Sequence, residues 1–172
     1  MNEEVIVETA AQMRDLGRQL ATLLRPGDLV IMTGPLGSGK TTLTQGIGDG
    51  LGVRGPVTSP TFVIARVHPG PTPLVHVDAY RLGSALELDD LDLDADTDMS
   101  VTIVEWGEGL AEDLASDRLE IAIMPVAASP GPLAPGDEPA DIGDQPRTVR
   151  VRGVGARWQD MRMTRADVFN RL

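Results

Sequence analysis

Residues 34–41 read G-P-L-G-S-G-K-T and match the G-x-x-x-x-G-K-[ST] pattern of a phosphate-binding loop. Lys40 of this pattern is the single lysine of the chain, and the other 14 basic side chains counted with it are arginines. A lysine ammonium is a compact point charge, whereas an arginine guanidinium is a wide planar fork. A lone lysine in an arginine-rich chain therefore indicates a position that needs a point charge, such as one beside the β- and γ-phosphates of a nucleotide.

The residues on both sides of this loop have the pattern of a strand, a loop and a helix in succession. Residues 28–33 are a short apolar run typical of a buried strand, and residues 41–51 are typical of a helix. The glycines of the loop let backbone N–H groups turn toward an anion, and the helix N-terminus adds its dipole. We therefore predict that the loop binds nucleotide phosphates.

Composition limits the class of protein. A length of 172 residues with 41% hydrophobic residues fits one folded α/β domain. The absence of cysteine excludes disulfides, thiolate catalysis and cysteine-ligated metal sites. No apolar run approaches the roughly 20 residues that span a bilayer, and the first residues lack the basic start of a signal peptide. We therefore expect a cytoplasmic protein that does not enter a membrane.

The formal net charge of -11 predicts that the chain as a whole repels nucleic acid. Arginines nevertheless gather near the end of the sequence, where they could form a local basic face. Their spacing is more typical of a solvated surface. They are Arg147, Arg150, Arg152, Arg157, Arg162 and Arg165.

The remaining pattern alternates helices and strands. Thr9 is a plausible N-cap for a helix that extends to about residue 24. We predict a single domain over residues 1–172, with a three-layer α/β P-loop NTPase fold and a mainly parallel sheet. Residues 126–146, with five prolines and three glycines, predict a mobile insertion between two strands. The predicted strands are residues 5–7, 28–33, 61–67, 74–77, 101–104, 119–124 and 148–151.

Residues 87–98 are strongly acidic, with seven carboxylates in twelve positions, and predict an acidic helix with a loop. Their spacing imitates the ligand offsets of an EF-hand. Met99, however, occupies the position that requires glycine, and residues 101–104 have the pattern of a strand. Calcium binding is therefore disfavoured.

Two carboxylates follow predicted strands directly. Asp78 ends the run L-V-H-V-D, and Glu105 ends V-T-I-V-E. In open α/β sheets, ligands bind beyond the carboxyl ends of the strands. The Thr41 hydroxyl is expected to bind Mg²⁺, with Glu105 or Asp78 completing the coordination directly or through water.

Other polar residues near these strands have two possible roles each. Thr58, Ser59 and Thr61 form a hydroxyl-rich loop that either senses a γ-phosphate or is an ordinary turn. Arg81 either neutralises phosphate or pairs with the acidic segment that follows it.

Two ring-bearing residues of these strands are predicted to be structural. His76 alternates with two valines on its strand, which favours a packed or hydrogen-bonded residue over a catalytic base. Trp106, directly after Glu105, is either a core residue or a stacking surface at the site, and the core is favoured.

Four segments taken in order resemble the TsaE family, the ATPase of bacterial tRNA threonylcarbamoyladenosine synthesis. They read G-P-L-G-S-G-K-T-T, P-V-T-S-P-T-F, H-V-D-A-Y-R and V-E-W. The resemblance covers about residues 13–124. It implies a protein that binds ATP and Mg²⁺ and works with the TsaD and TsaB proteins. Threonylcarbamoyl is placed on N6 of adenosine 37 in tRNAs that read codons beginning with A, so tRNA is reached indirectly through that complex.

The same resemblance implies roles for individual residues. Thr41 and Glu105 hold Mg²⁺, and Lys40, Asp78 and Glu105 serve catalysis, Asp78 being needed for hydrolysis. Residues 9–12 approach the adenine. The phosphates are held by Gly37, Ser38, Gly39, Lys40, Thr41 and Thr42. Because no residue stands out as a general base, we expect hydrolysis by the isolated protein to be slow.

Two other classes of nucleotide-binding protein share this length and loop. A small-molecule kinase needs a substrate pocket and usually an arginine-bearing lid, and no arginine lies between Arg81 and Arg118. Residues 126–146 with Arg147 are the remaining place for such a lid. A GTP-driven switch commonly selects guanine with an Asn-Lys-x-Asp motif, which is impossible when Lys40 is the single lysine.

Overall fold

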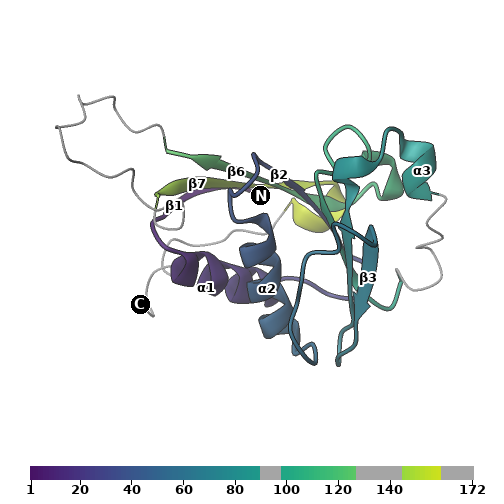
Figure 1. Cartoon of the computed structure of the whole chain (residues 1–172), viewed down its shortest axis with the longest axis horizontal. Helices are drawn as coiled ribbons and strands as arrows, with labels where there is room; N and C mark the ends of the chain where they lie inside the picture. Colours follow the sequence, from purple (N-terminus) through teal and green to yellow (C-terminus); the bar gives the residue numbers. More distant parts are fainter. Residues whose placement is uncertain (90–97, 127–144, 160–172) are drawn as a thin grey trace.

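A seven-stranded sheet in the order β1-β7-β6-β2-β5-β4-β3 forms the centre of the computed structural model (Figure 1). The structure describes residues 1–89, 98–126 and 145–159. The strands are β1 (Asn2–Val7), β2 (Leu29–Thr33), β3 (Ala65–His68), β4 (Leu74–Asp78), β5 (Val101–Glu105), β6 (Arg118–Pro125) and β7 (Arg147–Val154). The helices are α1 (Ala10–Ala21), α2 (Lys40–Leu51) and α3 (Ala85–Asp89), with short 3₁₀ turns η1 (Ala79–Arg81), η2 (Glu112–Leu114) and η4 (Ala156–Trp158).

The four inner strands β6, β2, β5 and β4 run parallel, and β7, β1 and β3 add antiparallel edges. All residues of β4 and β5 and the first four of β2 are buried, as expected for parallel strands covered on both faces. The predicted α/β fold with a mainly parallel sheet is confirmed.

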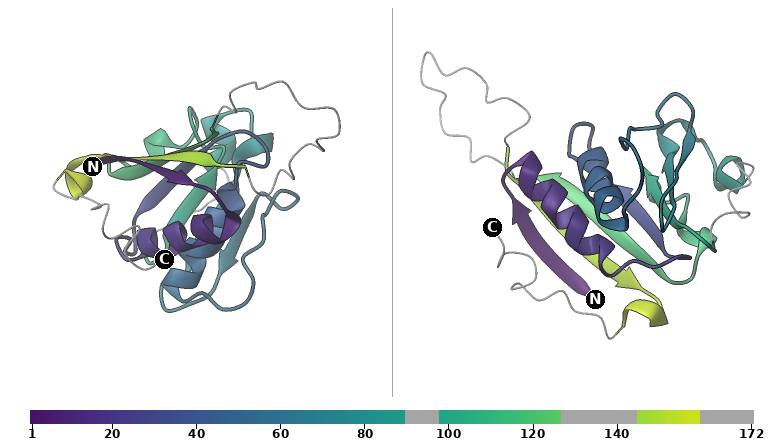
Figure 2. Two further views of the ribbon diagram at one scale, coloured as in Figure 1. Left: turned by 90° about the vertical axis from the view of Figure 1, so that its left-hand side faces the viewer. Right: turned by 90° about the horizontal axis from the view of Figure 1, so that it is seen from below.

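Helices cover the two faces of the sheet unequally. α1 and α2 lie side by side on one face, as both views of Figure 2 show. They bury the larger apolar cluster, which includes Leu20, Leu43 and Ile103. The opposite face buries a smaller cluster, in which Leu88 of α3 joins Val75 and Val77 of β4. No helix in the described ranges is long and apolar enough to cross a membrane.

Several predicted boundaries need correction. Residues 61–64 are not a strand, because the N–H groups of Val63 and Ile64 both donate to the Pro60 carbonyl and close a turn. The first helix ends at Ala21, earlier than predicted, although Thr9 is its N-cap and accepts from the Gln12 N–H. Of the predicted acidic helix, α3 is described, and residues 90–97 lie outside the described residues. Residues 127–144 of the predicted insertion, together with Arg162 and Arg165, also lie outside them.

Glycines bring α1 and α2 into close contact. A Cβ on Gly17 would lie 2.5 Å from the Leu43 carbonyl oxygen, and a Cβ on Gly46 would lie 2.1 Å from that of Arg14. Real Cβ atoms do not approach backbone so closely. Helix α2, which follows the phosphate-binding loop, can therefore pack closely against α1 because Gly17 and Gly46 have no side chains.

We expect Gly46→Ala to destabilise the fold although alanine favours helices. The gain in helix propensity is about 0.5–1 kcal/mol. Forcing a methyl group against backbone typically costs about 1–3 kcal/mol, and here neither helix can yield without moving as a whole. The free energy of unfolding from urea titration measures the balance.

Gly83→Ala is the matched control. Among the described residues, the atom nearest to a Cβ at Gly83 is a Glu87 carboxylate oxygen at 3.6 Å, an ordinary contact. Its free energy of unfolding should stay close to that of the wild type. Equal stabilities of the two variants would show that the helix contact tolerates a side chain.

His68 of β3 is a buried histidine that packs near His76 of β4. His68 is 4% exposed, and its ring centroid is 6.0 Å from that of His76. Burial lowers the pKa of His68, and the neighbouring His76 and Arg66 lower it further. Below its ordinary pKa of about 6.5, the unfolded chain therefore binds a proton at His68 that the folded chain resists.

The contribution of neutral His68 to stability is complete above that pKa and is lost as the pH falls below it. We expect His68→Gln, which does not titrate, to lose less unfolding free energy than the wild type between pH 7.5 and pH values below 6. Urea titrations at a series of pH values measure both slopes. Parallel slopes would contradict a lowered pKa at His68.

Candidate functional site

The phosphate-binding loop joins the buried strand β2 to α2. Gly37 and Gly39 have φ angles of 75° and 104°, a region that side chains disfavour. Gly39 is also the N-cap of α2, and its carbonyl accepts from the Leu43 N–H. The loop thus has the backbone that lets N–H groups and the helix N-terminus converge on an anion.

Two polar side chains of the loop are buried within it. Ser38 is 4% exposed, and its hydroxyl has no hydrogen-bond partner among the described residues. The Lys40 ammonium donates to the carbonyls of Gly34 at 2.8 Å and Pro35 at 3.1 Å. A buried hydroxyl without a partner is uncommon in folded proteins.

The Lys40 ammonium is also covered by an aromatic ring. It lies 3.7 Å from the ring centroid of Trp106, and the ring of Tyr80 is 5.1 Å from that indole. Burial lowers the pKa of Lys40, while the nearby carboxylates of Glu105 and Asp78 oppose that shift. The assignment of Trp106 to the core is wrong: the residue is half-buried and stands over the lysine, with a φ of 61°.

Glu105 ends β5 beneath the loop and is 3% exposed. Its Oε1 is 2.8 Å from His76 Nε2, and the Thr41 hydroxyl lies 3.1 Å from Oε1 and 3.3 Å from Oε2. The Thr44 hydroxyl is 3.4 Å from Oε1. The expectation that His76 is a hydrogen-bonded structural residue is therefore confirmed.

Asp78 ends β4 beside Glu105, its register partner in the parallel pair. Its Oδ2 accepts from the Thr61 hydroxyl at 2.7 Å and lies 3.4 Å from that of Ser59. Its Oδ1 accepts from the Tyr80 N–H at 3.1 Å. The hydroxyl-rich loop is thus tied to a candidate catalytic carboxylate.

These residues fit a magnesium ion. Thr41, Glu105 and Asp78 offer hard oxygen donors, which Mg²⁺ prefers. Among the described residues, no group of three or more His, Cys, Asp or Glu side chains could hold a metal by itself. That is typical of Mg²⁺, which is usually held by one or two protein oxygens together with substrate phosphates and water.

Arg147 lies near the site, although its sequence spacing predicted a solvated surface residue. It is 8% exposed, and its guanidinium donates to the Gly37 carbonyl at 3.3 Å. Arg147 begins β7 opposite Pro125 and Val7, so only the pairing of β7 with β6 and β1 brings it to the loop. No local pattern could have indicated this placement.

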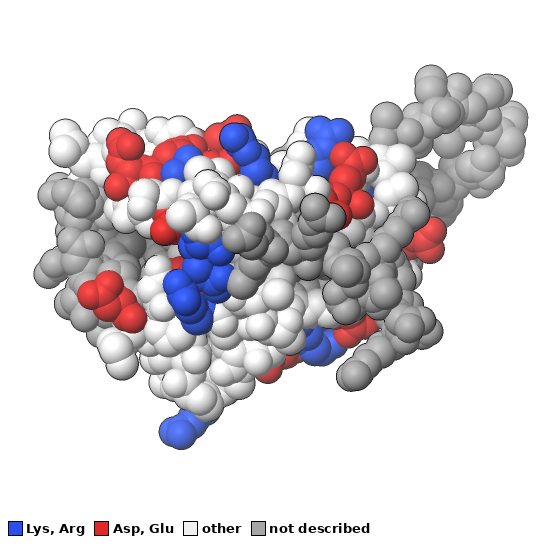
Figure 3. Space-filling model, turned by 180° about the vertical axis from the view of Figure 1, so that it is seen from behind, with Lys and Arg blue, Asp and Glu red and all other residues white. Residues whose placement is uncertain are grey.

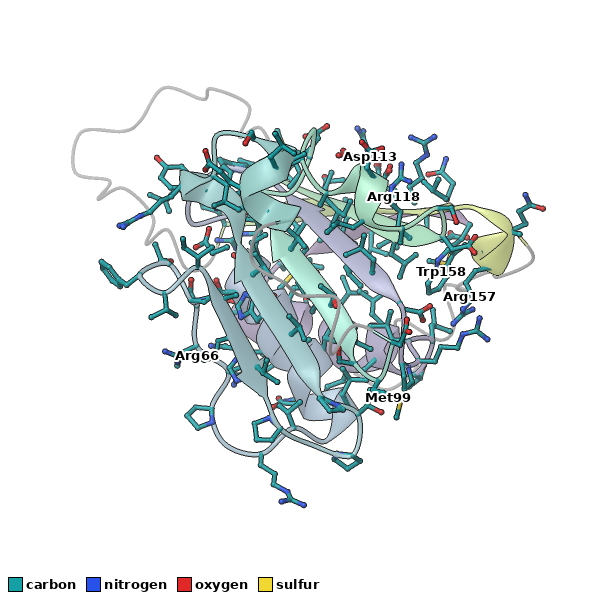
Figure 4. The ribbon with its side chains drawn as sticks, turned by 90° about the vertical axis from the view of Figure 1, so that its right-hand side faces the viewer. Arg66, Met99, Asp113, Arg118, Arg157 and Trp158 are labelled. Carbon is teal, nitrogen blue, oxygen red and sulfur yellow. The ribbon has the colours of Figure 1, made fainter. Side chains whose placement is uncertain are left out.

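The other described arginines near the end of the chain do not form a basic face. Arg150 pairs with Glu4, and Arg152 pairs with Glu120. Arg157 pairs with Asp28 at 3.1 Å and lies next to Trp158, on the side opposite to Arg66 in Figure 4. Figure 3 likewise shows basic and acidic side chains interspersed with uncharged ones.

Arg81, the other arginine considered for phosphate binding, stands 5.5 Å from the ring centroid of Phe62. Phe62 is 87% exposed at the tip of the hydroxyl-rich loop. The two roles expected for Arg81 stay predictions, because residues 90–97 of the acidic segment lie outside the described residues.

We expect Thr61→Val to destabilise the protein by removing the shortest hydrogen bond to Asp78. Valine has the shape of threonine without its hydroxyl. Hydrogen bonds to charged groups contribute about 1.5–3 kcal/mol, which should appear in the free energy of unfolding. Thr61→Ser keeps the hydroxyl and should recover most of this loss. If serine and valine destabilise equally, the methyl group rather than the hydroxyl holds the loop.

Comparisons with known proteins agree with this geometry. The model of the family described as threonylcarbamoyl adenosine biosynthesis protein TsaE matches residues 7–129. The tRNA threonylcarbamoyladenosine biosynthesis protein TsaE of Streptomyces coelicolor is 57% identical over 151 residues, 85% of this chain and 93% of that protein. The protein of the same name from Bacillus subtilis is 33% identical over 150 residues, 86% of this chain and 84% of that protein.

A solved structure agrees as well. The crystal structure of Bacillus subtilis YdiB matches with a TM-score of 0.68 and 27% identity, over 92% of this chain and 89% of that one. The family match includes the phosphate-binding loop, the hydroxyl-rich loop and both strand-end carboxylates. The resemblance noted in the four sequence segments is confirmed, and the chain belongs to the TsaE family, which takes part in the formation of threonylcarbamoyladenosine in tRNA.

Proposed function

We propose that this protein binds ATP with Mg²⁺ at the phosphate-binding loop and hydrolyses it in support of tRNA threonylcarbamoylation by TsaD and TsaB. The observation that carries the proposal is the convergence of four side chains on one edge of the sheet. Lys40 and Thr41 begin α2, and Asp78 and Glu105 end two adjacent parallel strands. This is the arrangement that positions a nucleotide triphosphate with its metal.

Each residue has a distinct task in the proposed reaction. Residues 37–42 bind the phosphates, and the Lys40 ammonium exchanges its loop carbonyls for phosphate oxygens. Thr41 and Glu105 hold Mg²⁺, which neutralises charge on the phosphates. Asp78 orients the attacking water.

The contacts of Asp78 and His76 support the expectation that the isolated protein hydrolyses ATP slowly. Asp78 already accepts from Thr61 and lies near Ser59, so the loop competes with water for its carboxylate. His76 is fully buried against Glu105 and is not available as a base. A partner that moves residues 58–64 would free Asp78, which makes turnover dependent on the partner proteins.

The proposed position of the adenosine is a groove beside α1. A groove of about 580 Å³ is lined by residues of α1, among them Ala10, Ala11 and Arg14, and by Thr42 and Gln45 of α2. It adjoins Thr42, at the end of the phosphate-binding segment. This location agrees with the approach of adenine to residues 9–12 that the family resemblance implies.

The proposed ATPase acts in the cytoplasm and reaches tRNA through its partner proteins. The whole chain of 172 residues acts as one ATPase domain in the cytoplasm. Its net charge of -11 disfavours direct binding to tRNA, so the partner proteins supply tRNA binding.

The test is ATP turnover by the wild type and by Lys40→Ala, each alone and with TsaD, TsaB and tRNA, while threonylcarbamoyladenosine is counted. We expect slow turnover alone and faster turnover with partners. Lys40→Ala should lose turnover and stop repeated rounds of modification, because the point charge beside the phosphates is gone. Arg54→Ala removes an exposed cation and should behave as the wild type.

Three results would contradict the proposal. Fast turnover without partners would remove the proposed dependence on them. Modification that proceeds equally without this protein would separate its ATPase from tRNA. Phosphate appearing on an acceptor molecule rather than in water would identify a small-molecule kinase.

A further inference from the structure

We propose that His76 is a positioning residue that holds the Glu105 carboxylate in the orientation needed for Mg²⁺. The inference rests on the proposed function, because it concerns the metal that Glu105 would bind. It adds a residue that touches neither nucleotide nor metal. His76 would act only through its hydrogen bond to Glu105.

The sheet places His76 on the side of the site. Val75 and Val77 point into the smaller apolar cluster, whereas Leu74 belongs to the larger cluster on the α2 face. Because side chains alternate along a strand, His76 shares the face of Leu74 and Asp78. From β4 it reaches across to the end of the neighbouring parallel strand β5.

The two carboxylate oxygens of Glu105 have different hydrogen-bond partners. Oε1 is 2.8 Å from His76 Nε2, the shortest contact of this carboxylate. Among the described residues, the hydrogen-bonding neighbour of Oε2 is the Thr41 hydroxyl at 3.3 Å. Since an ionised carboxylate only accepts, Nε2 carries the proton and donates to Oε1. Oε2 is therefore the oxygen left to a cation, and the Thr41 hydroxyl, 3.3 Å from it, is close enough to bind the same cation.

The threonines around Glu105 do not replace this hydrogen bond. Thr44 has one hydroxyl proton, and its hydroxyl lies closer to the Lys40 carbonyl, at 3.0 Å, than to Glu105 at 3.4 Å. Thr41 divides its single proton between the two carboxylate oxygens, and its own oxygen is the expected metal ligand. His76 is thus the one donor in this set that is committed to Oε1.

Burial makes a purely packing role for His76 unfavourable. The side chain is 0% exposed, and its Nδ1 has no hydrogen-bond partner among the described residues. A buried polar atom without a partner costs roughly 1–3 kcal/mol, which an apolar residue at this position would avoid. The hydrogen bond between His76 Nε2 and Glu105 is therefore the reason for an imidazole at this position.

His68 offers a matched comparison within the same hairpin. It is also a buried histidine, 4% exposed, and its Nε2 likewise has no partner among the described residues. Its ring centroid lies 6.0 Å from that of His76, and the histidine that contacts Glu105 is His76. A variant of His68 therefore reports on burial of a histidine in this hairpin without loss of the hydrogen bond to Glu105.

The experiment measures metal binding rather than turnover. Mn²⁺ is titrated into the ADP-bound protein in place of Mg²⁺, and free Mn²⁺ is counted by its paramagnetic resonance signal. ADP affinity is measured separately in EDTA. We expect His76→Leu to weaken Mn²⁺ binding about 10–100-fold, the usual effect of losing a residue that orients a metal ligand. ADP affinity in EDTA should be unchanged.

Two further variants separate the hydrogen bond from packing. His76→Gln places an N–H where Nε2 lies and should retain most of the Mn²⁺ affinity. His76→Asn is too short to reach Glu105 and should lose it, so this pair decides the matter if His76→Leu fails to fold. His68→Leu should leave Mn²⁺ affinity unchanged whatever its effect on the melting temperature.

The outcomes distinguish failure of the proposed metal site from failure of the proposed role of His76. A wild type that binds ADP but no Mn²⁺ would overturn the proposed metal site itself. A wild type that binds Mn²⁺, with His76→Leu or His76→Asn binding it equally well, would overturn only the role of His76. Equal losses in the His68 and His76 variants would also overturn it, because packing alone would then explain the effect.

Discussion

The carboxylate of Glu105 is the constraint around which the site is built. It is 3% exposed, and a buried charge costs several kcal/mol unless it is paired and hydrogen-bonded. Its neighbours come from two elements: His76 from β4, and Thr41 and the nearby Lys40 ammonium from α2. Only the parallel register of β4 and β5 and the start of α2 beyond β2 bring them together. The burial of Glu105 therefore requires that the sheet and the phosphate-binding loop keep their observed relative positions.

The position of α2 depends in turn on its contact with α1. Gly17 and Gly46 let the two helix backbones touch, and polar side chains continue the contact at the surface. Arg14 donates to the Gln45 side chain at 2.7 Å, and Gln45 donates to the Val57 carbonyl at 3.1 Å. Val57 directly precedes the hydroxyl-rich loop. The helix α2, the groove beside α1 and the loop near Asp78 are therefore linked through Gln45.

The sequence predicted the parts of the site that are local. The phosphate-binding loop, both strand-end carboxylates and the α/β alternation follow from short patterns, because each depends on neighbouring residues. Arg147 and Trp106 could not be placed in this way. Arg147 reaches the loop through antiparallel pairing across the segment from β6 to β7, and Trp106 leaves the core because its backbone adopts a positive φ. Such features depend on tertiary contacts that no local pattern encodes.

Two strained residues flank the candidate catalytic acids. Trp106 at φ 61° and Ile64 at φ 69° are the non-glycine residues with positive φ in the described ranges. Such conformations cost about 1–3 kcal/mol each and persist where surrounding contacts impose them. The Trp106 N–H donates to Met32 and holds the indole over Lys40, while the Ile64 carbonyl accepts from the Asp78 N–H. Each strained residue is therefore fixed by a backbone hydrogen bond. A rearrangement of the hydroxyl-rich loop would have to break the one between Ile64 and Asp78 as well as the one from Thr61.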